Sequence, residues 1–357
     1  PYTTLFRSSM PPTMVQGIRL AAIWLPAAMT PPVASNTSRI VVDALDSRPR
    51  RTTLVVGALV TDAIIDLIMT IGPEKPPKCG WRETILGCEN RTMSYLHTYE
   101  SSEQDRLQRQ ADLLRPMLYQ GWDIVGQPAR ILEVGCGTGA QLKNLRERFA
   151  SSQIVGLDRS PEQLATAACL LQGLDVQLIQ GDAKHLPWTP GSFDLVCVTF
   201  VLEHLSDPEG ALREMDRVMA PGAWVILSEV HNSSLYLFPE CPHTQEYWRL
   251  YNDMQRSLGG HPDIGVQLPY LAHSLGWKIT QYRNFAPCLD GRLQCPEERA
   301  QVIAFWTDLL ASALPSLLAS GFEADQFAAV RAELANLLHQ PDSVLDYSAR
   351  QLIARKS

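Results

Sequence analysis

Short runs of apolar and β-branched residues alternate with amphipathic stretches from Ala129 onward. The apolar runs are Arg130–Val134, Gln153–Leu157, Val176–Ile179, Phe193–Thr199 and Ala223–Ser228. The stretches between them, with apolar residues at three- and four-residue spacing, are Ala140–Phe149, Pro161–Gln172 and Pro208–Met219. Alternation of this length predicts βαβ units, and therefore a parallel sheet with helices on both faces.

The flanking regions follow other patterns. Helices are predicted at Ser101–Tyr119, Glu246–Leu258 and Val302–Ser320. Lys278–Phe285 and Leu345–Ala354 are predicted as two further strands. Because a helical insertion precedes it, the last strand is expected to join the sheet antiparallel.

A glycine-rich loop follows the first predicted strand, within Ile131–Gln141 (ILEVGCGTGAQ). Gly135, Gly137 and Gly139 allow a sharp turn and the close approach of a ligand, and the helix that follows offers free N–H groups. Several nucleotide-binding folds share this pattern. A tight glycine-rich turn without a ligand is the alternative.

Two acidic residues follow at the carboxyl ends of the next strands. Asp158, about twenty residues after the glycines, is placed to accept hydrogen bonds from both ribose hydroxyls. Asp182, in Gly181–Ala183, is placed to accept one from an adenine amino group. The alternative for Asp158 is an exposed capping residue before Ser160 and Pro161.

These motifs together resemble the class I S-adenosylmethionine-dependent methyltransferases. Five segments match in the right order: Glu133–Gly139, Asp158, Gly181–Ala183, Phe193–Leu205 and Met219–Trp224. The family usually has Lys before the Pro-Gly of the fifth segment, where this chain has Ala. The resemblance covers about residues 95–357.

The resemblance implies a Rossmann-like α/β fold: a seven-stranded, mostly parallel sheet with helices on both faces, an antiparallel last strand and a helical lid insertion. It implies S-adenosylmethionine as cofactor. The segment Tyr95–Glu100 and the helix after it resemble small-molecule methyltransferases whose N-terminal helix closes over the cofactor. The residues implied to bind the cofactor are Tyr99, Glu133, Gly135, Gly137, Gln141, Asp158, Arg159, Asp182, Ala183 and Phe200.

Methyl transfer from a sulfonium needs alignment of the reactants and exclusion of water more than it needs a dedicated base. No catalytic dyad or triad is evident in the sequence. His204 and His231 are weak candidates for a base, with a purely structural role as the alternative. Tyr236, His243 and Trp248 are candidates for the acceptor side, again with polar lining or packing as the alternative. The histidines show no HxxxH or HExxH spacing, so no metal is expected.

Charge and composition divide the chain. Residues 1–92 carry a net charge of +3 and residues 93–357 a net charge of −10, which disfavours a nucleic-acid acceptor. The apolar runs Met14–Ala34 and Leu54–Ile71 match a signal peptide and a membrane span poorly, since the first is broken by proline and the second contains two aspartates. The opening PYTTLFRS resembles the conceptual translation of a sequencing-library adapter. We therefore expect residues 1–92 to be a disordered or non-native leader, with Met93 as the natural start.

The sequence thus predicts one methyltransferase domain over residues 93–357, with its core at 127–230 and an acceptor and lid region at 231–340. The eight cysteines include no CxxC pair, which favours a reducing cytoplasm. The predicted activity is methylation of a small-molecule acceptor, with no nucleic-acid or membrane partner. Two alternatives stay open: a nucleotide-dependent oxidoreductase on a Rossmann-like fold, and a non-catalytic S-adenosylmethionine-binding protein.

Overall fold

The computed structural model describes residues 18–20, 42–44 and 101–357, with side chains from Glu103 onward. The chain divides into two units, Pro1–Gly87 and Cys88–Ser357, and each is described by itself. In the first unit, β1 (Ile18–Leu20) pairs antiparallel with β2 (Val42–Ala44). The predictions for Tyr99, Met93 and Leu54–Ile71 lie outside the described residues, as does most of the run Met14–Ala34.

A seven-stranded sheet forms the centre of the second unit, in the order β5-β4-β3-β6-β7-β11-β9. Its strands are β3 (Arg130–Val134), β4 (Gln153–Asp158), β5 (Gln177–Gln180), β6 (Phe193–Thr199), β7 (Met219–Glu229), β9 (Lys278–Phe285) and β11 (Ala349–Arg355). The pairs from β5 to β7 are parallel, and β11 runs antiparallel to both β7 and β9. The prediction of a mostly parallel sheet with an antiparallel last strand is confirmed.

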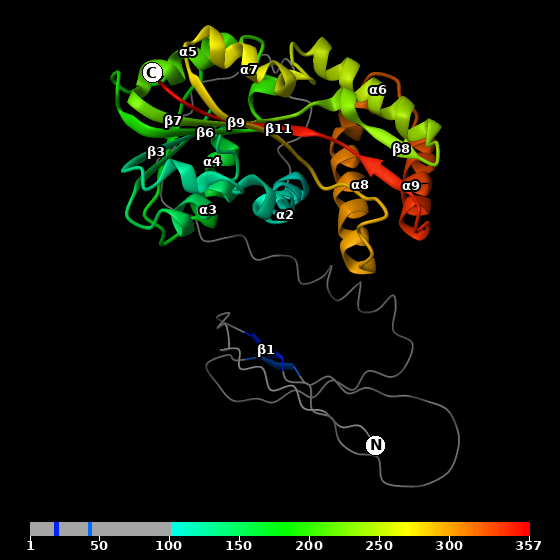
Figure 1. Ribbon diagram of the computed structural model, residues 1–357. Helices are drawn as coiled ribbons and strands as arrows, with labels where there is room; N and C mark the ends of the chain where they lie inside the picture. The colour runs from blue at the N-terminus through cyan, green and yellow to red at the C-terminus, as the bar shows by residue number, and fades with distance from the viewer. Residues whose placement is uncertain (1–17, 21–41, 45–100) are drawn as a thin grey trace, which may run out of the picture. The chain divides into compact units, whose positions relative to one another are not determined.

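Helices cover both faces of this sheet (Figure 1). They are α2 (Ser101–Leu118), α3 (Ala140–Arg148), α4 (Pro161–Leu170), α5 (Pro208–Val218) and α7 (Ile264–Ser274). Successive side chains of a strand point to opposite faces of the sheet. In β3, Ile131 packs in the cluster with α3 and α4, whereas Leu132 packs in the cluster with α5 and α7. Both faces are therefore buried, as the continuous apolar runs predicted.

Helix α7 lies within residues 231–340, the segment predicted from the sequence as the acceptor and lid region. Ile264, Leu268 and Leu271 are buried in the same cluster as the sheet residues, and Trp277 follows them there. Since these side chains pack on β7, β9 and β11, α7 is a helix of the sheet layer.

The last predicted strand is split in two. β10 (Val344–Asp346) pairs with β8 (Tyr236–Phe238), and only β11 joins the large sheet. The break falls at Tyr347 and Ser348, where the Tyr347 hydroxyl donates to Asn232 Oδ1 at 2.8 Å and the Ser348 N–H donates to Ser234 Oγ at 2.8 Å. The Ser234 hydroxyl thus takes the place of a ladder acceptor for the Ser348 N–H.

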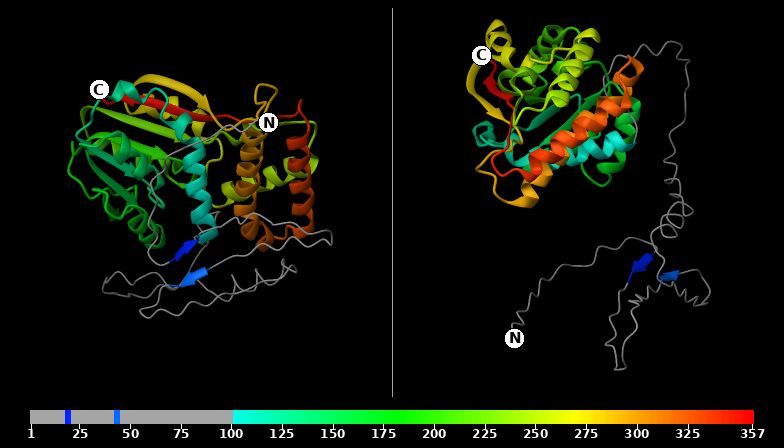
Figure 2. Two further views of the ribbon diagram at one scale, coloured as in Figure 1. Left: turned by 90° about the horizontal axis from the view of Figure 1, so that it is seen from below. Right: turned by 90° about the vertical axis from the view of Figure 1, so that its right-hand side faces the viewer.

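Three further helices gather beyond the carboxyl ends of the parallel strands: α6 (Pro242–Ser257), α8 (Pro296–Ala319) and α9 (Ala324–His339). Figure 1 and the left view of Figure 2 show α8 and α9 side by side. Among the described helices, α8 is long and apolar enough to cross a membrane by length and composition alone. Its Trp306, Leu310 and Ala313 are nevertheless buried in a cluster with α6 and α9.

Candidate active site

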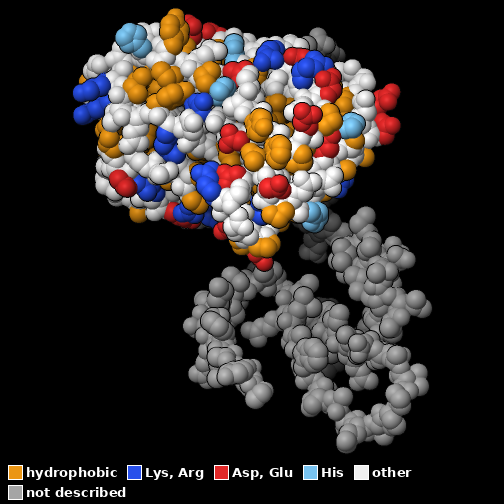
Figure 3. All heavy atoms as spheres, turned by 45° about the vertical axis from the view of Figure 1, so that its right-hand side comes forward, with side chains coloured by type: hydrophobic (Ala, Val, Ile, Leu, Met, Phe, Trp, Pro, Cys, Tyr) orange, Lys and Arg blue, Asp and Glu red, His pale blue; other side chains and the backbone are white. Residues whose placement is uncertain are grey.

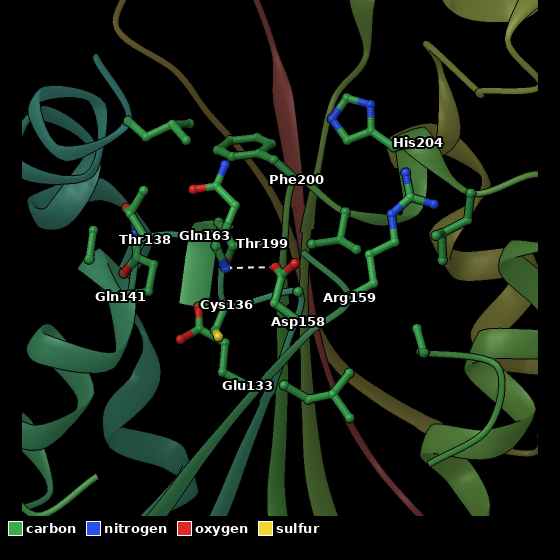
Figure 4. A pocket seen from close by; sticks show the side chains of 18 of the residues that line it. Glu133, Cys136, Thr138, Gln141, Asp158, Arg159, Gln163, Thr199, Phe200 and His204 are labelled. Carbon is green, nitrogen blue, oxygen red and sulfur yellow. Dashed lines mark hydrogen bonds between the residues drawn. The ribbon is translucent and has the colours of Figure 1, made fainter. Parts of the chain in front are cut away.

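A cavity of about 310 Å³ opens at the carboxyl ends of β3, β4, β5 and β6. Its wall is formed by the glycine loop, by the ends of the next strands and by one side of α2. Nine of the ten residues that the sequence assigned to the cofactor line it: Glu133, Gly135, Gly137, Gln141, Asp158, Arg159, Asp182, Ala183 and Phe200. Figure 4 shows Asp158 near the middle of this cavity, with Phe200 and His204 on one side and Glu133 on the other.

The glycine loop has backbone angles that other residues rarely adopt. Gly135, Gly137 and Gly139 have φ of +73°, +51° and +81°. A Cβ on Gly135 would lie 2.4 Å from a methyl carbon of Val201, whereas one on Gly137 would meet no atom within 4 Å. Gly135 is therefore required by packing, and Gly137 leaves space on the side of the cavity.

Asp158 joins the loop to the second strand. Its Oδ2 accepts the N–H of Gly137 at 2.8 Å, the dashed line of Figure 4, and its Oδ1 accepts the N–H of Ser160 at 2.9 Å. Each carboxylate oxygen keeps further acceptor capacity. Asp182, at the end of the third strand, accepts the N–H of Lys184 through Oδ1 at 2.9 Å. Two carboxylates thus stand along one edge of the cavity.

Glu133 is buried at the end of β3, and its Oε2 has no hydrogen-bond partner. Burial raises the pKa of this carboxyl well above its usual range, and the charge of Asp158 raises it further. A buried oxygen without a partner is costly, so a donor supplied by a bound ligand would satisfy it. The acceptor oxygens of this cavity therefore fit S-adenosylmethionine, whose amino group, two ribose hydroxyls and adenine amino group are donors.

Helix α2 closes the side of the cavity. Leu107, Gln110, Ala111 and Leu114 line it from this helix. The Gln108 side chain donates from Nε2 to Thr138 Oγ1 at 2.8 Å, which ties the helix to the glycine loop.

A second cavity of about 80 Å³ lies beside the first. The two share five lining residues: Leu107, Gln110, Leu114, Phe200 and His204. Its wall is aromatic, with Trp248, Tyr251, Phe285, Phe305, Trp306 and Tyr347. The second cavity therefore adjoins the first and presents apolar rings to its contents.

Phe200 and His204 mark the junction of the two cavities. Phe200 has φ of +55°, in the left-handed region, and its ring lies 6.0 Å from that of Phe285. Such strain in a non-glycine residue is typical of functional sites. Burial lowers the pKa of His204, and the charges of Arg159 and Arg106 lower it further against the opposing effect of Glu203, so its imidazole is neutral at pH 7.

The predicted acceptor residues are not brought together. Trp248 lines the second cavity, whereas His231, Tyr236 and His243 line neither. His231 Nδ1 lies 3.0 Å from Arg350 Nη2. Tyr236 is 59% exposed on β8, and His243 pairs through Nδ1 with Glu333 Oε1 at 2.8 Å. These three predicted acceptor residues therefore lie outside both cavities.

Glu203 is a lining residue that sequence reasoning quoted only as part of a motif. It is buried at 5% exposure in the second cavity. Its neighbours come from α6 and the turn after β7, far away in sequence, so no local signal pointed to it. Among the described residues, no group of three His, Cys, Asp or Glu side chains is arranged to hold a metal ion.

Comparison with known proteins assigns the strands and loops that form this cavity to a known domain family. Residues 132–227 match the model of a methyltransferase domain family. A demethylmenaquinone methyltransferase of Roseiflexus sp. is 30% identical over 182 residues, which cover 50% of this chain and 68% of that protein. The chain belongs to the class I S-adenosylmethionine-dependent methyltransferases. The cofactor of this family is S-adenosylmethionine.

Two other relatives match more narrowly. The demethylmenaquinone methyltransferase of Thermus thermophilus is 38% identical over 29% of this chain and 47% of its own length. The ajmaline N-methyltransferase of Rauvolfia serpentina is 42% identical over 29% of this chain and 38% of its own length. The chain thus spans less than half the length of these two curated relatives.

Proposed function

We propose that the protein transfers the methyl group of S-adenosylmethionine to a small-molecule acceptor. The observation that carries this proposal is the pair of adjoining cavities, one lined by the glycine loop and two carboxylates and the other by aromatic rings. A methyl donor in the first would face an acceptor in the second across Phe200 and His204.

The cofactor would be held by residues of this chain in distinct roles. The Asp158 carboxylate, fixed by Gly137 and Ser160, would accept the ribose hydroxyls. Asp182 and Ala183 would bind the adenine, and the unpartnered Glu133 oxygen would accept the amino group. When bound, the cofactor supplies a methyl group already activated by the positive charge on sulfur.

The remaining catalysis is positioning and exclusion of water. Helix α2 covers the first cavity, and the aromatic wall of α6 and α8 encloses the second. His204, neutral and at the junction, is the described histidine best placed to accept a proton. His231 is not, because it lies against Arg350 outside both cavities.

Several observations support a small-molecule acceptor. The aromatic cavity suits a flat or apolar molecule. The relatives are named for methylation of demethylmenaquinone and of ajmaline. Basic and acidic side chains are interspersed on the face shown in Figure 3, with no basic stripe there. The six described cysteines are free, and this supports the prediction that the protein resides in a reducing cytoplasm.

Calorimetric titration with S-adenosylmethionine, S-adenosylhomocysteine and NAD tests the cofactor. We expect saturable binding of the first two. Binding of NAD with no response to either sulfur compound would instead support the oxidoreductase alternative.

Turnover is tested by release of S-adenosylhomocysteine in the presence of reduced naphthoquinones and alkaloid amines. Cofactor binding without product release for any acceptor class would favour a non-catalytic binding protein.

A further inference from the structure

A buried carboxylate faces the aromatic cavity. Glu203 is only 5% exposed, lines this cavity and follows directly on the strained Phe200 turn. Its Oε2 accepts a hydrogen bond from Gln255 Nε2 at 2.7 Å, and its Oε1 lies 3.7 Å from His204 Nε2. An ionised group in such a place is costly unless an opposite charge or several donors balance it.

The described residues supply no such cation. No Lys or Arg among them forms an ion pair with Glu203. Arg106, which also lines the cavity, donates from Nε and Nη2 to the Glu103 carboxylate at 2.8 and 2.7 Å. The hydrogen bonds of these two nitrogens thus go to a carboxylate other than Glu203.

A second carboxyl behind Glu203 strengthens this imbalance. Glu229 is fully buried, and it accepts the N–H groups of Val201 and Leu202 through Oε1 and that of Glu203 through Oε2. Burial raises the pKa of Glu229 to about 8, and the neighbouring charge of Glu203 adds to this. Glu229, itself an acid, therefore gives Glu203 no countercharge.

The walls of the cavity favour a cation as well. The rings of Trp248 and Tyr251 stack at 4.9 Å, and Trp306 meets Trp248 edge-on at 5.8 Å. Aromatic faces attract ammonium groups, most strongly where water is excluded. An apolar cavity with one unbalanced carboxylate and aromatic walls is complementary to an organic cation.

We propose that the acceptor is an apolar amine, which binds as its ammonium ion beside Glu203 and is methylated on nitrogen. This inference rests on the proposed methyltransferase activity. Glu203 both pairs with the ammonium and takes a proton from it.

One N–H bond of the ammonium breaks, and its proton passes to the Glu203 carboxylate. The nitrogen lone pair then forms a bond to the methyl carbon, while the carbon–sulfur bond breaks and its electron pair stays on sulfur. The positive charge moves from sulfur to nitrogen, and the proton on Glu203 later leaves to solvent.

A network from α6, the turn after β7 and the break between β10 and β11 positions Glu203. Asn232 Nδ2 lies 3.3 Å from Gln255 Oε1 and 2.8 Å from Asn252 Oδ1, and the Tyr347 hydroxyl donates to Asn232 Oδ1 at 2.8 Å. Since these groups fix the orientation of the Gln255 amide, its Nε2 is aimed at the carboxylate. Gln255 is thus a positioning residue for Glu203.

The test compares probes that share a shape and differ in charge. Tetrahydroisoquinoline carries a protonated ring nitrogen, and isochroman has an oxygen at the same place. In calorimetric titrations with S-adenosylhomocysteine bound, we expect the amine to bind at least about tenfold more tightly than the ether. The variant E203Q should reduce this preference to about twofold or less, while its affinity for S-adenosylhomocysteine stays within about twofold of wild type.

Two controls separate charge from structure. E203D keeps the charge and should keep the preference for the amine. E209Q removes an exposed carboxylate on α5, 61% exposed, and should leave every value unchanged. If E203Q does not fold, equal binding of the amine and the ether by the wild-type protein would still overturn the proposal.

The proposal is overturned if isochroman binds the wild-type protein as tightly as the amine, or if E203Q keeps the full preference. Methyl transfer to a naphthol but not to the amine would also overturn it, while leaving the methyltransferase activity standing. Absence of any S-adenosylhomocysteine binding would instead remove the proposed function and this inference with it.

Discussion

Gly135 and Val201 approach each other so closely that a single added carbon would fill the space between them. The Cβ of an alanine at position 135 would lie 2.4 and 2.8 Å from the two methyl carbons of Val201, at a backbone φ of +73°. The loop and the turn that carries Glu203 are therefore packed against each other through a glycine. This contact joins the loop of the first cavity to the turn that lines the second.

We expect Gly135→Ala to lower the free energy of unfolding by about 2–4 kcal/mol, since overpacking adds to the strain of a left-handed alanine. Gly173→Ala is the matched control, because φ there is +81° but no atom lies within 4 Å. It should cost only about 1 kcal/mol. Equilibrium urea unfolding measures both, and adding Val201→Ala to the first variant should recover part of the loss. Equal costs at the two glycines would contradict the packing argument.

Asp158→Asn tests the carboxylate at the centre of the cofactor cavity. The substitution keeps the shape of the side chain but removes its charge and one acceptor oxygen. We expect affinity for S-adenosylhomocysteine to fall by about 1.5–3 kcal/mol, on the order of ten- to a hundredfold. Asp175→Asn, at a fully exposed carboxylate, is the control and should change nothing. Unchanged affinity in Asp158→Asn would show that another group binds the ribose.

At the scale of elements, one carboxylate joins α9 to the start of α6. Glu333 accepts the backbone N–H groups of His243 and Thr244 at 3.0 and 2.8 Å, and the Thr244 hydroxyl at 2.7 Å. Burial alone would raise the pKa of this carboxyl, but the hydrogen bonds from Thr244 and His243 outweigh it and hold the pKa below its usual value of 4.5. The ionised form therefore anchors the helix N-terminus, where negative charge is favourable.

Glu333→Gln should lower the free energy of unfolding by about 1–2 kcal/mol at pH 7. Because the folded-state pKa is lowered, the contribution of Glu333 is present above the ordinary pKa and is lost as pH falls through the folded value. The stabilities of wild type and variant should therefore converge in acid. Urea unfolding across a pH series measures this, with the exposed Glu240→Gln as control. A difference that is constant with pH would contradict the assignment.

The elements were more predictable than the site. Strands β3 and β6 begin and end where the apolar runs do, because a fully buried strand leaves an uninterrupted apolar segment between polar turns. The break at Tyr347 was not predictable, since it depends on a hydroxyl bonded to Asn232, 115 residues earlier. The place of Glu203 in the site was not predictable for the same reason. Its partner Gln255 is 52 residues away, on a helix whose position only the fold determines.

In the whole molecule, every described residue that lines either cavity belongs to the unit Cys88–Ser357. A protein consisting of residues 88–357 should therefore bind S-adenosylhomocysteine within about twofold of the full chain. At a ligand concentration of 100 times Kd, its free energy of unfolding should rise by about 2.7 kcal/mol, as should that of the full chain. The measurement is thermal or urea unfolding with and without ligand.

A shorter chain that starts at Tyr119 is the informative comparison, because it lacks α2. That helix contributes Leu107, Gln110 and Leu114 to both cavities, and Gln108 bonds to the glycine loop. We expect this chain to lose most of its affinity for the ligand, since the cavity would be open along one side. If the 88–357 chain lost affinity as severely as this one, the cofactor site would depend on residues 1–87 as well, and the division into two units would not describe the binding function.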